Sequence, residues 1–175
     1  QYIGSLYPQI QVVRNDESTI EEIKNLQNLE ALVISPGPGY PDSAGISKEA
    51  IKTFGKEIPV LGICLGHQAL ARAFGAELRQ LSAPLHGHPT TLTVTDAGDL
   101  LLQKIAPPLI VGRYHSWIVD PDSMPEELIA SSHDEAGHIM SFYHRNLPIH
   151  GVQFHPESCI SNCGPALIRN WLATC

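Results

Sequence analysis

The chain has 175 residues, a hydrophobic content of 43% and a formal net charge of −7. That length supports one domain with its own core, and the apolar runs are far shorter than a membrane span. The acidic balance, without any basic stripe, argues against nucleic acid as a partner. We expect a domain that binds neither membrane nor nucleic acid and, since no signal peptide is evident, one that is cytoplasmic.

Four cysteines are present without a CxxC pair or a disulfide framework, which is typical of a reducing, cytoplasmic setting. Cys159 and Cys163 are four residues apart, but no second pair completes a zinc site. His86 and His88 flank a glycine and lack an obvious third ligand. We expect no metal site.

Strands and helices alternate in the first half of the chain. In order, the sequence predicts a strand over 10–14, a helix after Ser18, a strand over 31–35, a Pro- and Gly-rich loop, a helix over 47–54, a strand over 59–63, and a helix over 65–74 that Gly75 ends. Ser18 and Glu21 have the spacing of a capping box, and Ser47 is expected to cap its helix. The alternation indicates βαβ units and a mostly parallel sheet.

After Gly75 the pattern changes to short strands with few helices between them. Strands are predicted over 76–81, 90–94, 109–113, 127–132, 138–143 and 149–154, with a hairpin turn at Gly137 and a last amphipathic helix over 164–174. We therefore predict an α/β fold with a mostly parallel sheet flanked by helices. The second half is expected to add antiparallel strands or a small side sheet.

The first residues, QYIGSLY, have the pattern of a helix end whose beginning is absent. Strands of a doubly wound sheet usually follow another βα unit. The sequence contains no linker, internal repeat or low-complexity tract. Residues 1–175 are therefore expected to form a single domain that lacks its first strand and the start of its first helix.

The stretch VLGICLGHQAL (60–70) places Cys64 between a strand and a helix, with Gly62 and Gly66 two residues before and after it. A nucleophile elbow has this arrangement, because small residues let the two backbones pack closely. The helix N-terminus would favour a thiolate, and the free N–H groups after Cys64 could hold an oxyanion. A buried structural cysteine is the alternative.

A thiolate needs a proton partner, and His155 stands out among nine histidines. It follows an apolar strand in GVQFHPES, and Glu157 projects to the same side of an extended backbone. We predict Cys64 as the nucleophile, His155 as its base and acid, and Glu157 as the group that orients His155. The alternative is a strand-end histidine beside a chance carboxylate.

The segments GICLGHQ and HPE resemble those of the class I glutamine amidotransferases. SPGPG (35–39) and RYHS (113–116) are similar to the glutaminase subunits of anthranilate and aminodeoxychorismate synthases. The resemblance covers essentially the whole chain. It implies a flavodoxin-like fold, the triad of Cys64, His155 and Glu157, and no cofactor. Relatives begin with a strand and an Asp-Asn-Tyr-Asp-Ser-Phe type loop, and this sequence has no counterpart of that loop.

The resemblance also implies a substrate site. The oxyanion hole would consist of the backbone N–H groups of Leu65 and Gly39. Glutamine would be bound by residues of three segments, namely Gly37, Pro38, Gly39, Gln68, Ser116 and Trp117. The family usually has leucine at the position of Trp117, so a tryptophan there could reshape the rim of the pocket.

The implied activity is hydrolysis of L-glutamine through a cysteine thioester, with the ammonia passed to a chorismate-binding synthase subunit on a separate chain. A stand-alone γ-glutamyl hydrolase or peptidase of the same fold stays open. So do an amidotransferase for nucleotide synthesis and a non-catalytic binding subunit. The motifs do not separate an anthranilate product from an aminodeoxychorismate product.

Overall fold

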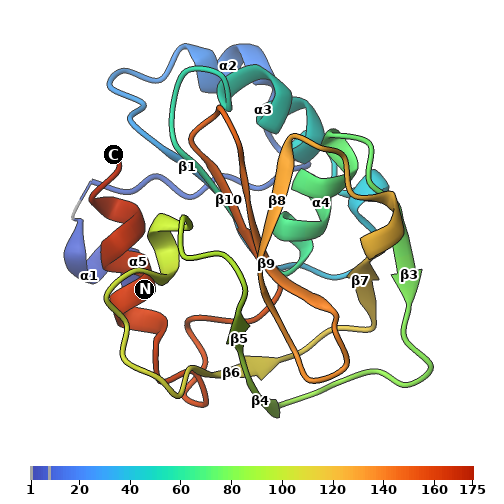
Figure 1. Cartoon of the computed structure of the whole chain (residues 1–175). Helices are drawn as coiled ribbons and strands as arrows, with labels where there is room; N and C mark the ends of the chain where they lie inside the picture. Colours follow the sequence, from blue (N-terminus) through green and yellow to red (C-terminus); the bar gives the residue numbers. More distant parts are fainter. Residues whose placement is uncertain (1, 8) are drawn as a thin grey trace.

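A six-stranded sheet runs through the middle of the computed structural model, which describes residues 2–7 and 9–175 (Figure 1). The strand order is β1-β2-β10-β9-β8-β5. The first three strands are parallel and the others continue the sheet antiparallel: β1 (Leu32–Ile34), β2 (Val60–Ile63), β10 (Ile149–Val152), β9 (Ile139–His144), β8 (Leu128–His133) and β5 (Thr93–Val94). The α/β class and the antiparallel extension predicted from the sequence are confirmed.

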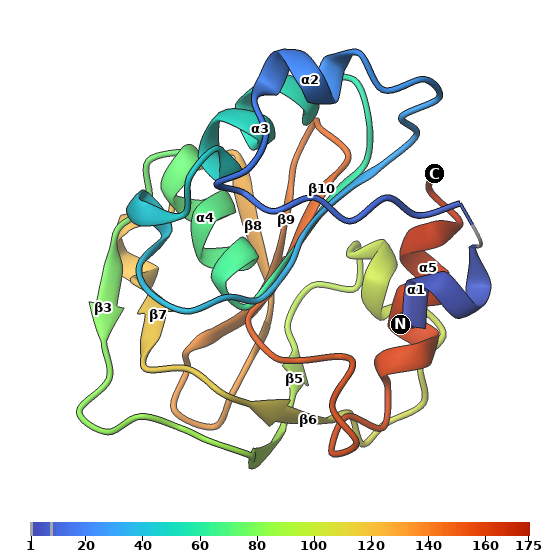
Figure 2. The same cartoon turned by 180° about the vertical axis from the view of Figure 1, so that it is seen from behind.

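Helices cover both faces of the sheet (Figures 1 and 2). One face carries α2 (Ile20–Lys24), α3 (Ser47–Phe54) and α4 (Leu65–Ala73), and the other carries α5 (Gly164–Leu172) with the short α1 (Tyr2–Leu6) beside it. Neighbouring residues of a strand face opposite sides. Val60 accordingly packs in the core under α3 and α4, while Leu61 packs in the core under α5. All four residues of β2 are buried, so its end is a firm base for the turn that follows.

Two small antiparallel pairs lie beside the main sheet. They join β3 (Leu78–Gln80) to β7 (Trp117–Val119) and β4 (His88–Thr91) to β6 (Ile110–Arg113). The side sheet that the sequence left open is therefore present in addition to the antiparallel extension. β7 was not predicted, because it has only three residues. Three single 3₁₀ turns complete the described elements: η1 (Pro41–Ser43), η2 (Leu100–Leu102) and η3 (Pro121–Ser123).

The strand predicted over 10–14 is wrong. Its residues form no strand in the described part of the chain, and the side chain of Val12 is 88% exposed. A strand needs a neighbour for its backbone N–H and C=O groups, and among the described residues no strand pairs with this segment. The apolar composition of 10–14 favours an extended backbone, but a strand forms only where such a neighbour is present.

Two predicted helix caps are also corrected. The capping box of α2 is formed by Thr19 and Glu22, one residue later than Ser18 and Glu21, and this register buries Ile20 and Ile23. Ser47 is the first residue of α3, and no side chain caps that helix. Gly75 follows α4 with φ of 99°, as its predicted role requires.

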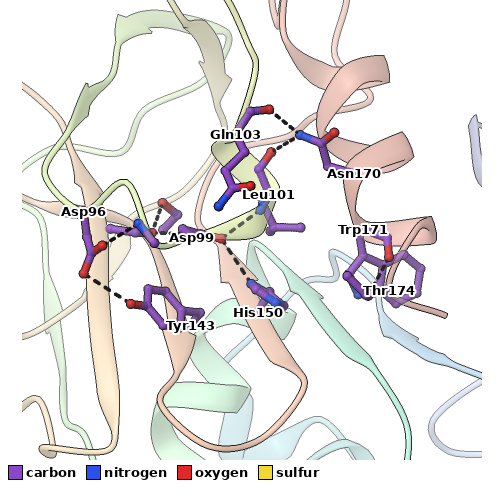
Figure 3. A network of polar contacts seen from close by, with 12 residues as sticks. Asp96, Asp99, Leu101, Gln103, Tyr143, His150, Asn170, Trp171 and Thr174 are labelled. Atoms are coloured by element: carbon purple, nitrogen blue, oxygen red, sulfur yellow. Dashed lines mark hydrogen bonds and ion pairs between the residues drawn. The ribbon is translucent and has the colours of Figure 1, made fainter.

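The segment between β5 and β6 is fastened to the sheet and to α5 by buried polar groups (Figure 3). Asp99 is fully buried and accepts hydrogen bonds from the Leu101 N–H at 3.0 Å and from Ser131 Oγ at 2.5 Å, and its Oδ1 lies 3.2 Å from His150 Nδ1. Asn170 on α5 donates to the carbonyl of Leu101 at 2.9 Å. One carboxylate thus links η2, β8 and β10.

Candidate active site

Cys64 lies at the tip of the turn from β2 into α4. Its φ of 52° and ψ of −102° form a strained conformation that typically costs about 1–3 kcal/mol. The turn is held on both sides, because the Cys64 N–H donates to the Val152 carbonyl at 2.8 Å and the Cys64 carbonyl accepts from the Gln68 N–H at 3.1 Å. This geometry is that of a nucleophile elbow.

Gly62 and Gly66 are needed for the close crossing at this elbow. A Cβ at Gly62 would lie 2.5 Å from the carbonyl oxygen of Gly66, and a Cβ at Gly66 would lie 2.0 Å from the carbonyl oxygen of Ile34. Both separations are far below any real contact of a Cβ atom. The spacing of the two glycines around Cys64 therefore follows from the packing of α4 against β1 and β2.

His155 and Glu157 reach the site because β10 pairs directly with β2 and the chain leaving β10 passes Cys64. His155 Nδ1 lies 2.7 Å from Glu157 Oε1. The backbone of His155 is also fixed. Its N–H donates to the Gly112 carbonyl on β6 at 3.0 Å, and its carbonyl accepts from Ser161 Oγ at 2.6 Å. The imidazole is therefore held at both its ring and its main chain.

The charge on His155 is set by its neighbours. Burial lowers the pKa of His155, but the neighbouring Cys64 and Glu157 outweigh burial and raise that pKa to about 9. Burial raises the pKa of Glu157, but the hydrogen bond to His155 outweighs it and lowers that pKa. At neutral pH the ring is therefore an imidazolium beside a carboxylate. Its buried Nε2 has no hydrogen-bond acceptor of ordinary geometry in the described chain, which leaves this nitrogen for Cys64.

A cavity of about 170 Å³ opens beside Cys64. All the residues predicted to bind glutamine or to form the oxyanion hole line it, namely Gly37, Pro38, Gly39, Leu65, Gln68, Ser116 and Trp117. Gly39 has φ of 89°, a conformation that suits glycine. The ring of Tyr40 meets that of Trp117 edge to face at 5.1 Å, which joins the glycine loop to β7. His155 and Glu157 line a second, more open depression on the other side of Tyr114.

Gln68 is held more tightly than the sequence suggests. Its Nε2 donates to the carbonyl of Trp117 at 2.9 Å and to Gln153 Oε1 at 3.1 Å. Both amide protons are thereby used within the protein. The Gln68 oxygen is the part of this side chain that remains for a ligand in the cavity.

Five residues near the site were not predicted to take part in it. His86, Tyr114 and His115 line the cavity. Arg113 is buried behind His115, and the buried Gln153 directs its Nε2 toward Cys64 Sγ at 3.8 Å. RYHS contains three of these residues and GVQFHPES contains Gln153, while His86 had been weighed only as a metal ligand. Their burial and their place at the cavity arise only in the folded chain, so local spacing could not identify them.

In residues 2–7 and 9–175, no group of three or more His, Cys, Asp and Glu side chains is arranged to hold a metal ion. None of the helices described is long and apolar enough to cross a membrane.

The chain is similar to known proteins over nearly its whole length. The family model of class-I glutamine amidotransferases matches residues 1–175. The chain is 42% identical to aminodeoxychorismate/anthranilate synthase component 2 of Bacillus subtilis, over 99% of this chain and 88% of that protein. It is also 42% identical to aminodeoxychorismate synthase component 2 of Escherichia coli, over 98% of this chain and 90% of that one.

A fused relative and a solved structure extend the comparison. The bifunctional protein TrpGD of Thermotoga maritima is 42% identical over 98% of this chain, which spans 29% of that longer protein. The crystal structure of a candidate GMP synthase subunit from Thermoplasma acidophilum superposes with a TM-score of 0.85 at 26% identity, over 99% of this chain and 84% of that one. This chain belongs to the class-I glutamine amidotransferase family.

Proposed function

We propose that this protein is the glutaminase subunit of a chorismate-aminating synthase, either an anthranilate synthase or an aminodeoxychorismate synthase. The observation that carries the proposal is Cys64 on its strained elbow, with an imidazolium on one side and a cavity on the other. The names of the relatives at about 42% identity support the chorismate branch.

The first half of the reaction is acyl transfer. The Cys64 thiolate attacks the side-chain amide carbon of L-glutamine, and the carbonyl oxygen becomes an oxyanion. The backbone N–H groups of Leu65 and Gly39 stabilise it, and one such donor typically contributes about 100- to 1,000-fold in rate. The carbon–nitrogen bond then breaks, and His155 gives its proton to the leaving nitrogen. Ammonia leaves, and a γ-glutamyl thioester remains on Cys64.

The second half is hydrolysis. Neutral His155 takes a proton from water, and the oxygen of that water attacks the thioester carbon. The carbon–sulfur bond breaks, which releases glutamate and restores the thiolate beside a protonated His155. Glu157 keeps Nδ1 of the ring protonated and correctly oriented throughout.

The remaining cavity residues hold the substrate. Gly37, Pro38 and Gly39 form the loop over the bound glutamine, and the backbone at Ser116 and Trp117 holds its amino-acid end. The Gln68 oxygen accepts from the ammonium group of the substrate. No cofactor takes part in this half-reaction.

We further propose that the ammonia passes to a separate, chorismate-binding component 1. Ammonia is largely protonated in neutral water and would then be lost as a nucleophile, so a shielded path to the partner preserves it. We expect low glutaminase activity from the isolated protein and higher activity with the partner bound. The four free cysteines fit the reducing cytoplasm as the place of action.

Glutamate release from L-glutamine tests the proposal, measured with and without a component 1 protein, beside Cys64→Ala. We expect activity that requires Cys64 and rises on adding the partner, with an aminated chorismate product that names the branch. Cys64-dependent cleavage of γ-glutamyl peptides without any effect of the partner would instead indicate a stand-alone hydrolase. Equal activity of Cys64→Ala and the parent protein would refute the mechanism.

A further inference from the structure

Gln153 is the residue after β10, and its side chain is fully buried. It does not line the cavity beside Cys64. Its amide nevertheless makes two contacts that matter for the site. Its Oε1 accepts from Gln68, and its Nε2 lies 3.8 Å from the sulfur of Cys64. Gln153 therefore meets the reactive atom from inside the protein, where the substrate does not reach.

The direction of this contact is fixed by chemistry. The Trp117 carbonyl can only accept a hydrogen bond, so the Gln68 atom that faces it must be the nitrogen. The second proton on that nitrogen then points to Gln153, whose oxygen must face it. Gln153 consequently turns its own nitrogen toward Cys64. Every amide in this chain of hydrogen bonds has one allowed orientation.

The Trp117 carbonyl also accepts a hydrogen bond from His115, whose orientation is set by Arg113. The Arg113 Nε–H can only donate, so His115 Nε2, at 3.0 Å, must accept. His115 therefore carries its proton on Nδ1, which donates to the Trp117 carbonyl at 3.0 Å. Burial and the neighbouring Arg113 lower the pKa of His115 to about 3, so the ring stays neutral. Arg113 is in turn paired with Asp134 at 2.5 Å in the β8–β9 hairpin.

We propose that Gln153 is a positioning residue that donates its amide N–H to the Cys64 thiolate, in a direction imposed by the chain Arg113, His115, Trp117 carbonyl and Gln68. This inference rests on the proposed function, in which Cys64 is the nucleophile. A thiolate has three staggered side-chain positions available. The Gln153 donor, together with His155, holds the sulfur in the one that faces the cavity.

Gln153→Met and Gln153→Glu test this role, because both keep the length of the side chain. Met cannot donate, and Glu places an acceptor with a negative charge near the sulfur. We expect kcat for glutamine hydrolysis to fall roughly ten-fold in Gln153→Met, the effect of losing one hydrogen bond to a charged group. The fall in Gln153→Glu is expected to be larger. KM should change less than two-fold in Gln153→Met, because residue 153 does not line the cavity.

A second readout does not depend on glutaminase activity. The rate of Cys64 alkylation by iodoacetamide, followed by peptide mass spectrometry, should fall in the order Gln, Met, Glu at position 153. Cys159 is exposed and serves as the internal control in the same digest, with an unchanged rate. If the parent protein alkylates normally but releases no glutamate, the proposed function fails while the role of Gln153 is still tested.

Ser132→Ala is the matched control, because Ser132 is equally buried and its hydroxyl makes one hydrogen bond, to Ser141 at 2.6 Å, outside the site. Ser132→Ala should lower the melting temperature without changing kcat or the rate of Cys64 alkylation.

If Gln153→Met does not fold, Gln153→Asn replaces it, since its shorter amide is drawn one methylene away from the sulfur. Unchanged kcat and alkylation in a folded Gln153 variant would overturn the proposal, as would a rise in KM with kcat unaltered.

Discussion

At the scale of single residues, the pair of His155 and Glu157 sets the pH range of the reaction. The pKa of His155 is raised to about 9, so its proton is present at neutral pH and is lost as the pH rises through 9. We expect kcat/KM to fall on the alkaline side with a midpoint near pH 9. Glu157→Gln removes one of the groups that raise this pKa, so the midpoint should move to lower pH, with kcat roughly 100-fold lower. Steady-state rates from pH 6 to 10 measure both effects.

The contact between Glu157 and His155 has the opposite pH dependence, because it is lost as the pH falls. The pKa of Glu157 is lowered, so its stabilising contact with His155 is complete above the ordinary range of a carboxyl group. That contact is lost only as the pH falls through the lowered pKa. An alkaline midpoint that is identical in the parent protein and in Glu157→Gln would contradict the coupling between the two side chains.

At the scale of elements, the elbow between β2 and α4 depends on the absence of a side chain at Gly66. In Gly66→Ala, the new Cβ would lie 2.0 Å from the Ile34 carbonyl oxygen, so α4 must move away from β1. Such overpacking typically costs about 1–3 kcal/mol, and it displaces Cys64 as well. We expect a lower urea midpoint together with a loss of glutaminase activity of at least about ten-fold.

Gly4→Ala is the control for this substitution, because Gly4 is also helical and its Cβ would meet only Ile10 Cδ1 at 3.7 Å. Alanine in a helix interior is favoured over glycine by up to about 1 kcal/mol, so this variant should be neutral or more stable. A Gly66→Ala protein as stable and active as Gly4→Ala would show that the close crossing is not required.

The aromatic pair of Tyr40 and Trp117 connects two elements that form the cavity. Its edge-to-face contact holds the glycine loop against β7, and such pairs contribute about 0.5–1.5 kcal/mol beyond burial. In Trp117→Leu the loop loses this contact, so we expect KM for glutamine to rise about two- to ten-fold with a smaller change in kcat. Trp117→Phe keeps an aromatic edge and should stay near the parent value. Equal KM values in the Leu and Phe variants would show that the contact does not order the loop.

The elements that the sequence predicted well are those whose signals are local. The elbow around Cys64 and the His155–Glu157 spacing each lie within one short segment, so the residues themselves carry the information. The strand over 10–14 failed because pairing depends on a neighbour, and β7 was missed because it has only three residues and its partner β3 lies far away in the sequence. Gln153 was missed for the same reason, since its partners Cys64 and Gln68 lie far away in the sequence. His115 was missed although Arg113 and Trp117 are two residues away, because only its burial in the folded chain distinguishes it.

At the scale of the whole molecule, the buried carboxylate of Asp99 fastens the segment between β5 and β6 to the sheet. It links η2 to β8 and β10 (Figure 3). His155 follows the end of β10 in the chain. Asp99→Ala would leave Ser131 and His150 without their common partner. A buried hydrogen-bonding group left without its partner typically costs about 1–3 kcal/mol. We expect a loss of this size in the free energy of unfolding, measured by urea denaturation.

We expect Asp99→Ala to lower stability but not the binding of glutamine, because Asp99 does not line the cavity. Below its lowered melting temperature, Asp99→Ala should keep a KM for glutamine near that of the parent protein. Asp96→Asn is the matched control, because Asp96 belongs to the same network but is only partly buried, and asparagine keeps the oxygen that accepts from the Gly98 N–H. The free energy of unfolding of Asp96→Asn should fall by no more than about 1 kcal/mol. If Asp99→Ala is no less stable than Asp96→Asn, the buried carboxylate does not fasten η2 to the sheet.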